Sequence, residues 1–124
     1  MRALALLCAC LVTLATVGCG DKGPTRKVDD ATVMKEVLLR QLPVGTPIGE
    51  AQKFMEQEGF KCVSRKNRTF SEAGTDHEDI DYLYCTRTDE VTPPALKRKW
   101  HIAVVENSDA VADVLISTRL IEEP

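Results

Sequence analysis

The stretch Pro43–Cys62, PVGTPIGEAQKFMEQEGFKC, constrains the fold of this chain more than any other part of the sequence. Thr46 is a typical N-cap residue, and Pro47 follows it at the first helical position, where the missing N–H of proline costs nothing. Gly59 suits the left-handed position after the helix end, and Phe60 is expected to pack back against the helix. The stretch therefore predicts a turn, a short helix, a glycine stop and a following strand.

A first helix is predicted over Asp30–Leu42. Asp29 or Asp30 can cap its N-terminus by accepting from free backbone N–H groups, and Pro43 should end it. The apolar residues recur at intervals of three and four, which is typical of one buried helical face. These residues are Val33, Met34, Val37, Leu38 and Leu42.

Alternation of apolar and polar residues predicts four strands in the second half of the chain. The predicted strands are Phe60–Ser64, Ile80–Arg87, Trp100–Glu106 and Val111–Leu120. Polar stretches with glycine or proline are expected to form the loops Arg65–Glu78 and Thr88–Lys97, and Glu106–Asp109 a turn. The element order predicts one α+β domain over residues 30–121, with two N-terminal helices packed on an antiparallel meander of about four strands.

The first 18 residues have the plan of a secretory signal peptide. One basic residue, Arg2, precedes an apolar stretch that is short for a membrane span, and small residues follow it. Residues 19–29 are rich in glycine, proline and charge, so we expect a flexible tether there.

The leader ends in Thr16-Val17-Gly18-Cys19, which resembles the lipobox of bacterial lipoproteins. Val17 and Gly18 match that pattern, whereas Thr16 stands where the family has leucine or another aliphatic residue. The resemblance implies cleavage before Cys19, acylation of its thiol and an extracytoplasmic protein anchored to membrane lipid. Gly20 rather than aspartate follows the cysteine, which favours the outer membrane in a cell that has one. The alternative is an unmodified cysteine at the end of an ordinary leader.

Cys62 and Cys85 remain in the folded part of the chain, on consecutive predicted strands. Two cysteines in an exported domain favour a disulfide, which would stabilise the domain by roughly 3 kcal/mol. A zinc site built from these cysteines with His77 and His101 is the alternative. The spacings lack the short cysteine or histidine pairs of such sites, so no metal and no cofactor is predicted.

The formal net charge of −3 disfavours binding to nucleic acid, which needs a net basic surface. The acidic run Asp76–Asp81 lacks the glycine and the ligand spacing of a calcium loop and is interpreted as solvated. Two basic runs, around Lys61–Arg68 and Lys97–Lys99, are interpreted as charged rims. No catalytic motif occurs, so no catalytic residue is predicted.

Tyr82 and Tyr84 are possible partner-binding residues. They alternate with Leu83 and Cys85, so helices that cover the cysteine face would leave both rings on the other face. Exposed aromatic residues on a sheet are typical of protein-binding surfaces. The alternative is that loops cover them.

The turn Val44-Gly45-Thr46 and the element order are similar to two groups of proteins. These are the small outer-membrane assembly lipoproteins and the secreted β-lactamase-inhibitor proteins. The resemblance implies a non-catalytic binding module that works through its sheet face, where a protein partner is possible. The hypothesis is thus a membrane-anchored extracytoplasmic binding or structural domain. The alternative is a small lipid-anchored hydrolase or ligand-binding enzyme in the cell envelope, for which converging carboxylates in an open pocket are expected.

Overall fold

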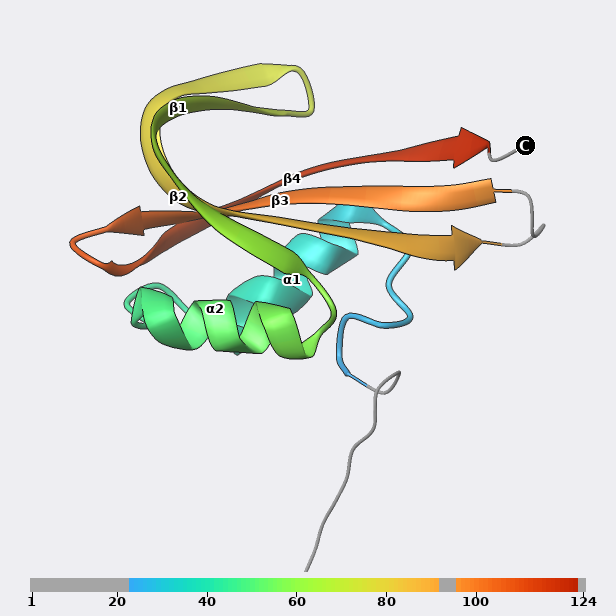
Figure 1. Cartoon of the computed structure of the whole chain (residues 1–124), viewed down its shortest axis with the longest axis horizontal. Coiled ribbons are helices and arrows are strands. Elements are labelled where there is room, and N and C mark those ends of the chain that lie inside the picture. Colours follow the sequence, from blue (N-terminus) through green and yellow to red (C-terminus); the bar gives the residue numbers. More distant parts are fainter. Residues whose placement is uncertain (1–22, 92–95, 123–124) are drawn as a thin grey trace, which may run out of the picture.

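The computed structural model describes residues 23–91 and 96–122, so the leader and Cys19 lie outside the described residues. The helices are α1 (Ala31–Gln41) and α2 (Ile48–Gln57). The strands are β1 (Lys61–Glu72), β2 (Thr75–Val91), β3 (Leu96–Asn107) and β4 (Ala110–Glu122). The four strands form one antiparallel sheet in the order β1-β2-β3-β4, with both helices on one side (Figure 1). The predicted α+β class and meander are confirmed.

The N-terminus of α1 is capped by Asp30, whose carboxylate accepts a hydrogen bond from the backbone N–H of Val33 at 3.4 Å. Met34 and Leu38 are buried on its apolar face, and the helix ends at Gln41, before Pro43. Capping and periodicity are local properties, which is why the sequence predicts this helix within one residue at each end.

The predicted cap of α2 at Thr46 is wrong. The Thr46 hydroxyl donates to the Pro43 carbonyl at 2.7 Å, and Pro47 is the N-cap without a side-chain hydrogen bond. The preceding residues are held extended because the backbone of Thr46 accepts from the Val111 N–H at 2.8 Å and Pro47 bridges Ala110. Pairing with β4 therefore delays the start of the helix.

The predicted glycine stop of α2 is confirmed. Gly59 has φ of 91° and donates to the Glu56 carbonyl at 3.0 Å. Phe60 donates to the Met55 carbonyl at 3.0 Å, and both side chains lie in the same core. This pair of hydrogen bonds is the Schellman motif, which satisfies the last carbonyls of the helix.

The predicted loop Arg65–Glu78 is wrong, because these residues lengthen β1 and β2 into one hairpin. The strands are joined by Ala73 and Gly74, both with positive φ, as a two-residue hairpin turn requires. The expected loop Thr88–Lys97 is also shorter, since β2 runs to Val91 and β3 begins at Leu96. Backbone hydrogen bonds between neighbouring strands do not depend on apolar side chains, so polar residues extend the ladder.

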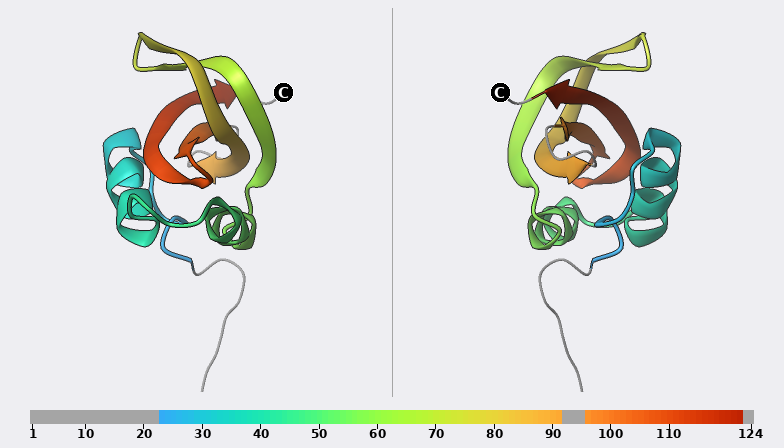
Figure 2. Two further views of the ribbon diagram at one scale, coloured as in Figure 1. Left: turned by 90° about the vertical axis from the view of Figure 1, so that its left-hand side faces the viewer. Right: turned by 90° about the vertical axis from the view of Figure 1, so that its right-hand side faces the viewer.

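The end of this hairpin folds back over the sheet (Figures 1 and 2). Its pairing register shifts between Arg65 and Arg68 and again before Phe70, and such bulges bend a strand. The Glu72 carboxylate, at the end of β1, then accepts from the Ile116 N–H of β4 at 3.0 Å and from Lys35 of α1 at 2.9 Å. A hairpin that starts at one edge of the sheet is thereby attached to the opposite edge.

The sheet separates two cores. On one face, α1 lies along β4, and α2 lies against β1 and β2 (Figure 2). The core on this face includes Leu83, Cys85 and Trp100. On the other face, which we call the open face, the folded-back hairpin covers a smaller cluster. That cluster consists of Phe70, Tyr82, Ala103 and Leu115.

The described part of the predicted tether is docked rather than free. Thr25 is fully buried, and both its N–H and its hydroxyl donate to the Glu58 carboxylate, the former at 3.0 Å. Gly23 lies so close to that carboxylate that any Cβ there would collide with it. The sequence does not predict this contact, because Thr25 and Glu58 are 33 residues apart.

Arg87, on β2, also binds the N-terminal segment. Its guanidinium donates to the Thr25 hydroxyl at 2.8 Å and to the Glu58 carbonyl at 2.7 Å. It also forms a two-pronged ion pair with Asp89, both contacts at 2.8 Å, and Asp89 accepts from the Trp100 indole N–H at 3.0 Å. This buried network, which we call the Arg87 lock, attaches the N-terminal segment to the helix side of the sheet.

Candidate functional site

The open face contains a hollow of about 370 Å³ between the folded-back hairpin and the four strands. β1 contributes Arg65 and residues 69–71, and the opposite wall comes from β4. The floor is built from β2 and β3, because their even-numbered and odd-numbered residues respectively point to this face. The lining residues are Arg65, Thr69, Phe70, Ser71, Tyr82, Tyr84, His101, Ser117 and Arg119.

Tyr84 and His101 form a fixed pair on the floor of the hollow. The Tyr84 hydroxyl lies 2.6 Å from Nδ1 of His101, and the two rings stack with centroids 6.0 Å apart. Burial lowers the pKa of His101, and the nearby positive charges of Lys99 and Arg119 lower it further. A neutral imidazole can accept from the phenol at Nδ1, which leaves its own proton on Nε2 as a donor.

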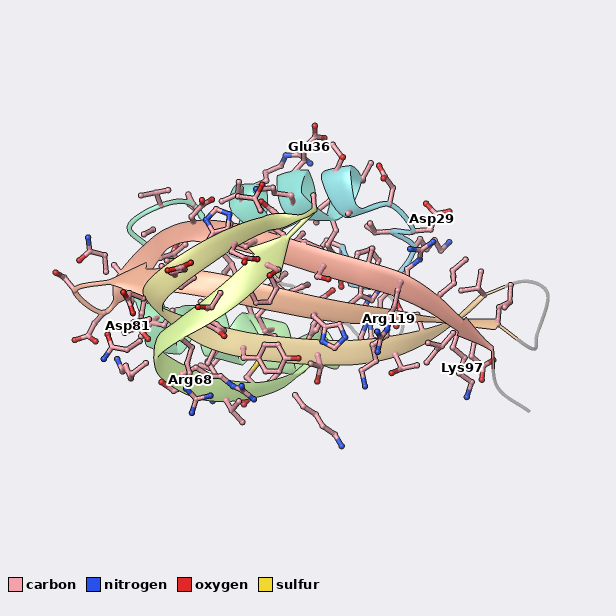
Figure 3. All side chains as sticks on the ribbon, turned by 90° about the horizontal axis from the view of Figure 1, so that it is seen from above. Asp29, Glu36, Arg68, Asp81, Lys97 and Arg119 are labelled. Atoms are coloured by element: carbon pink, nitrogen blue, oxygen red, sulfur yellow. The ribbon has the colours of Figure 1, made fainter. Side chains whose placement is uncertain are left out.

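Two guanidinium groups stand on opposite sides of the hollow. Arg65 lies over the Tyr84 ring, with its central carbon 4.5 Å from the ring centroid, and Arg119 comes from β4 (Figure 3). Within residues 23–91 and 96–122, neither of these arginines forms an ion pair. The described residues that line the hollow include no aspartate or glutamate, although Asp76 accepts a hydrogen bond from the lining residue Ser71.

The positive charge continues along the open face beyond the hollow. A neighbouring depression of about 330 Å³ is lined in part by Lys61 and Lys99. Lys97 lies further along the same side of β3 and is visible near the end of the sheet in Figure 3. Glu90 of β2 is the register partner of Lys97, so the basic surface is concentrated around Lys61, Arg65, Lys99 and Arg119.

Of the two alternatives for Tyr82, the structure has the covered ring and not the exposed one. Its side chain does lie on the face away from the helices, but only 3% of it is exposed. Phe70 from the folded-back hairpin covers it, with ring centroids 5.7 Å apart, and its hydroxyl donates to the Thr69 carbonyl at 3.4 Å. Tyr84 is half-buried and lines the hollow.

Sequence reasoning missed Arg65, His101 and Arg119 as members of one site. The available signal was the alternation of residues along the strands. It places His101, which pairs with Thr86 and Ser117, on the same face as Tyr84. The return of the hairpin over the sheet, which closes the hollow, has no signal in the local sequence.

Cys62 and Cys85 lie on the helix side, directly opposite one another in the β1–β2 register. Their sulfur atoms are 3.0 Å apart, which exceeds the roughly 2.05 Å of a disulfide bond, so both are thiols in this structure. The hydrogen bond between them lowers the pKa of Cys62 and, together with burial, raises the pKa of Cys85. The disulfide stays a prediction.

The residues of the alternative zinc site are not brought together, since His101 lies on the face opposite the cysteines and His77 pairs with Phe70 in the hairpin. Residues 23–91 and 96–122 hold no group of three side chains suited to a metal ion. The run Asp76–Asp81 belongs to β2 rather than to a loop. Neither described helix has the length and apolar character needed to cross a membrane.

Comparison of the chain with protein-family models, with curated proteins and with solved structures finds no match.

Proposed function

We propose that this protein is a lipid-anchored extracytoplasmic module that binds a partner or ligand through the open face of its sheet. The observation that carries the proposal is the division of the sheet into two faces. One face is filled by α1 and α2, and the other holds the hollow of about 370 Å³ with its aromatic and cationic lining. Rigid strands position the residues of the hollow, as a binding site requires.

The position of the N-terminal segment supports an anchored arrangement. Gly23 enters the domain on the helix side, and the open face lies on the opposite side (Figure 1). Cys19 lies four positions before Gly23, a separation that spans about 14 Å at most when extended. With an acylated Cys19, a domain held by the Arg87 lock would thus present its open face away from the lipid surface.

The lining of the hollow bears on the alternative of a small enzyme. A hydrolase that uses two carboxylates needs them to converge on the substrate, whereas this hollow brings together cations, hydroxyl groups and one imidazole. Such a set is suited to holding a ligand, so the chemistry of the lining favours the binding function over carboxylate-based catalysis.

Site-specific photocrosslinking in intact cells tests the use of the open face. A photoreactive phenylalanine derivative at Thr88, which is exposed on this face, should give adducts. The same residue at Glu36, which is exposed on α1, is the matched control and should give none. Adducts from Glu36 alone would reject the proposal.

Anchoring is tested separately through Cys19. We expect Cys19→Ala to leave an unprocessed precursor that takes up no labelled palmitate, because the acylated thiol would be absent. Mature protein of normal size that remains at the membrane in this variant would reject lipidation.

A further inference from the structure

Two guanidinium groups that form no ion pair with the described residues line the same hollow. Arg65 is held by stacking on Tyr84, and Arg119 approaches from β4. We propose that this hollow binds a small organic acid, whose carboxylate or phosphate group lies between Arg65 and Arg119. The inference rests on the proposed use of the open face and adds the chemical class of what binds there.

The balance of charge around the hollow favours an anion. His101 is faced by Arg65 from β1, Tyr84 from β2, Lys99 on its own strand and Arg119 from β4. Burial and the positive charges of Lys99 and Arg119 lower the pKa of His101, so two cationic side chains lie close to this imidazole. An oxyanion would relieve their mutual repulsion and gain charge-assisted hydrogen bonds from the guanidinium groups.

Neutral donors are also directed into the hollow. The Nε2–H of His101 is free when Nδ1 accepts from Tyr84, and the Ser117 hydroxyl lies opposite it on β4. Such donors suit the several lone pairs of a carboxylate or phosphate.

The walls of the hollow indicate that the anion has an organic body. Phe70, Tyr82 and Tyr84 form a cluster of edge-to-face rings along one side. The volume of about 370 Å³ is at the lower end of small-molecule sites, which run from about 300 to 1,000 Å³. Phe70 and Tyr82 are themselves buried, whereas Tyr84 is half-buried and presents ring surface that an inorganic ion would not cover.

The test is a titration of the full chain in a neutral detergent at constant ionic strength, followed by NMR of the His101 ring. The probes are phenyl phosphate and benzoate, with inorganic phosphate and neutral benzyl alcohol as comparisons. We expect both aromatic anions to bind, to shift the His101 signals and to raise its pKa, because a bound anion stabilises the imidazolium. If they bind no more tightly than benzyl alcohol, the anion site is rejected. If inorganic phosphate binds as tightly as phenyl phosphate, the organic part of the inference is overturned.

Matched variants test the residues. Arg119→Gln should weaken binding of phenyl phosphate about tenfold or more, the loss expected for a charged hydrogen bond. Arg40→Gln, an exposed site on α1, removes the same charge and should leave the affinity unchanged. Equal effects of the two variants would overturn the assignment.

Ser117→Glu supplies an internal carboxylate, so it should abolish binding and raise the pKa of His101 without ligand. This variant and the comparison of probes on the unmodified chain test whether the hollow binds an organic anion, even where an arginine variant fails to fold. Adducts at Thr88 without any anion binding would overturn this inference alone and leave the proposed function standing.

Discussion

The carboxylate of Glu72 accepts a hydrogen bond from the backbone N–H of Ile116 at 3.0 Å, although the two residues are 44 positions apart. The bond joins the end of β1 to β4, the strand at the opposite edge of the sheet. It supplies an acceptor for a donor on an edge strand, and Glu72 lies two residues after Phe70, whose ring packs on Tyr82. Phe70 and Ser71, which precede Glu72 on β1, line the hollow of the open face.

Glu72→Gln should loosen the folded-back hairpin. Loss of the charged acceptor for Ile116 and Lys35 is expected to lower the free energy of unfolding by about 1–2 kcal/mol. Hydrogen exchange of the Ile116 amide should become faster, and the Tyr82 ring should become more exposed. Glu78→Gln, at an exposed position of the same hairpin, is the control. Unchanged Ile116 exchange in Glu72→Gln would contradict this role.

Thr25→Val should release the N-terminal segment from the Arg87 lock. The variant removes the hydroxyl that connects Arg87 with Glu58, at an expected cost of about 1–3 kcal/mol. Trypsin should then cut more quickly after Arg26 and Lys27 than in the unmodified protein. Thr32→Val, at an exposed position of α1, should leave the cleavage rate as it is. Equal cleavage rates in both variants would show that the segment is not held by this network.

Two glycines should respond to alanine in opposite directions. At Gly59, φ is 91° and a Cβ would lie 2.9 Å from the Arg26 guanidinium, so Gly59→Ala should destabilise the fold by roughly 1–2 kcal/mol. Gly49 lies inside α2 with open space around it, so Gly49→Ala should stabilise by about 0.5–1 kcal/mol. Chemical unfolding of both variants provides the measurement, and effects of the same sign would refute the expectation.

We have two expectations for Cys62 and Cys85, one for the oxidised and one for the reduced protein. In protein exported to an oxidising compartment, thiol labelling after denaturation without reductant should find neither Cys62 nor Cys85. In reduced protein, Cys62 should be alkylated at lower pH than an ordinary thiol, because the hydrogen bond with Cys85 lowers its pKa. Cys85→Ala removes that bond and should move the alkylation profile of Cys62 to higher pH. Two free thiols in the exported protein would reject the disulfide.

His101 should make the fold less stable in mild acid. Its pKa is lowered in the folded state, so the unfolded chain binds the proton more readily once the pH falls below about 6.5. Stability therefore decreases as the pH falls through and below that value. His101→Gln should reduce the difference in melting temperature between pH 7.5 and pH 5.5. An unchanged difference in His101→Gln would contradict the lowered pKa.

The sequence alone determines the features that depend on near neighbours in the chain. The Asp30 cap, the stop at Gly59 with the return of Phe60 onto Met55, and the assignment of Tyr82 and Cys85 to opposite faces follow from spacing and residue type. Each rests on contacts within a few residues or on the alternation of a strand, which local chemistry specifies.

The tertiary structure alone decided the rest. Residues 65–78 look like a polar loop, yet they form a hairpin because each strand supplies hydrogen-bonding partners for the other. Thr25 looks like part of a tether, yet Arg87 and Glu58 bury it from 62 and 33 residues away. The hollow likewise draws Arg65, Tyr84, His101 and Arg119 from four strands. Their proximity depends on the strand register and on the bend of the hairpin, and these are set by the packing of the whole domain.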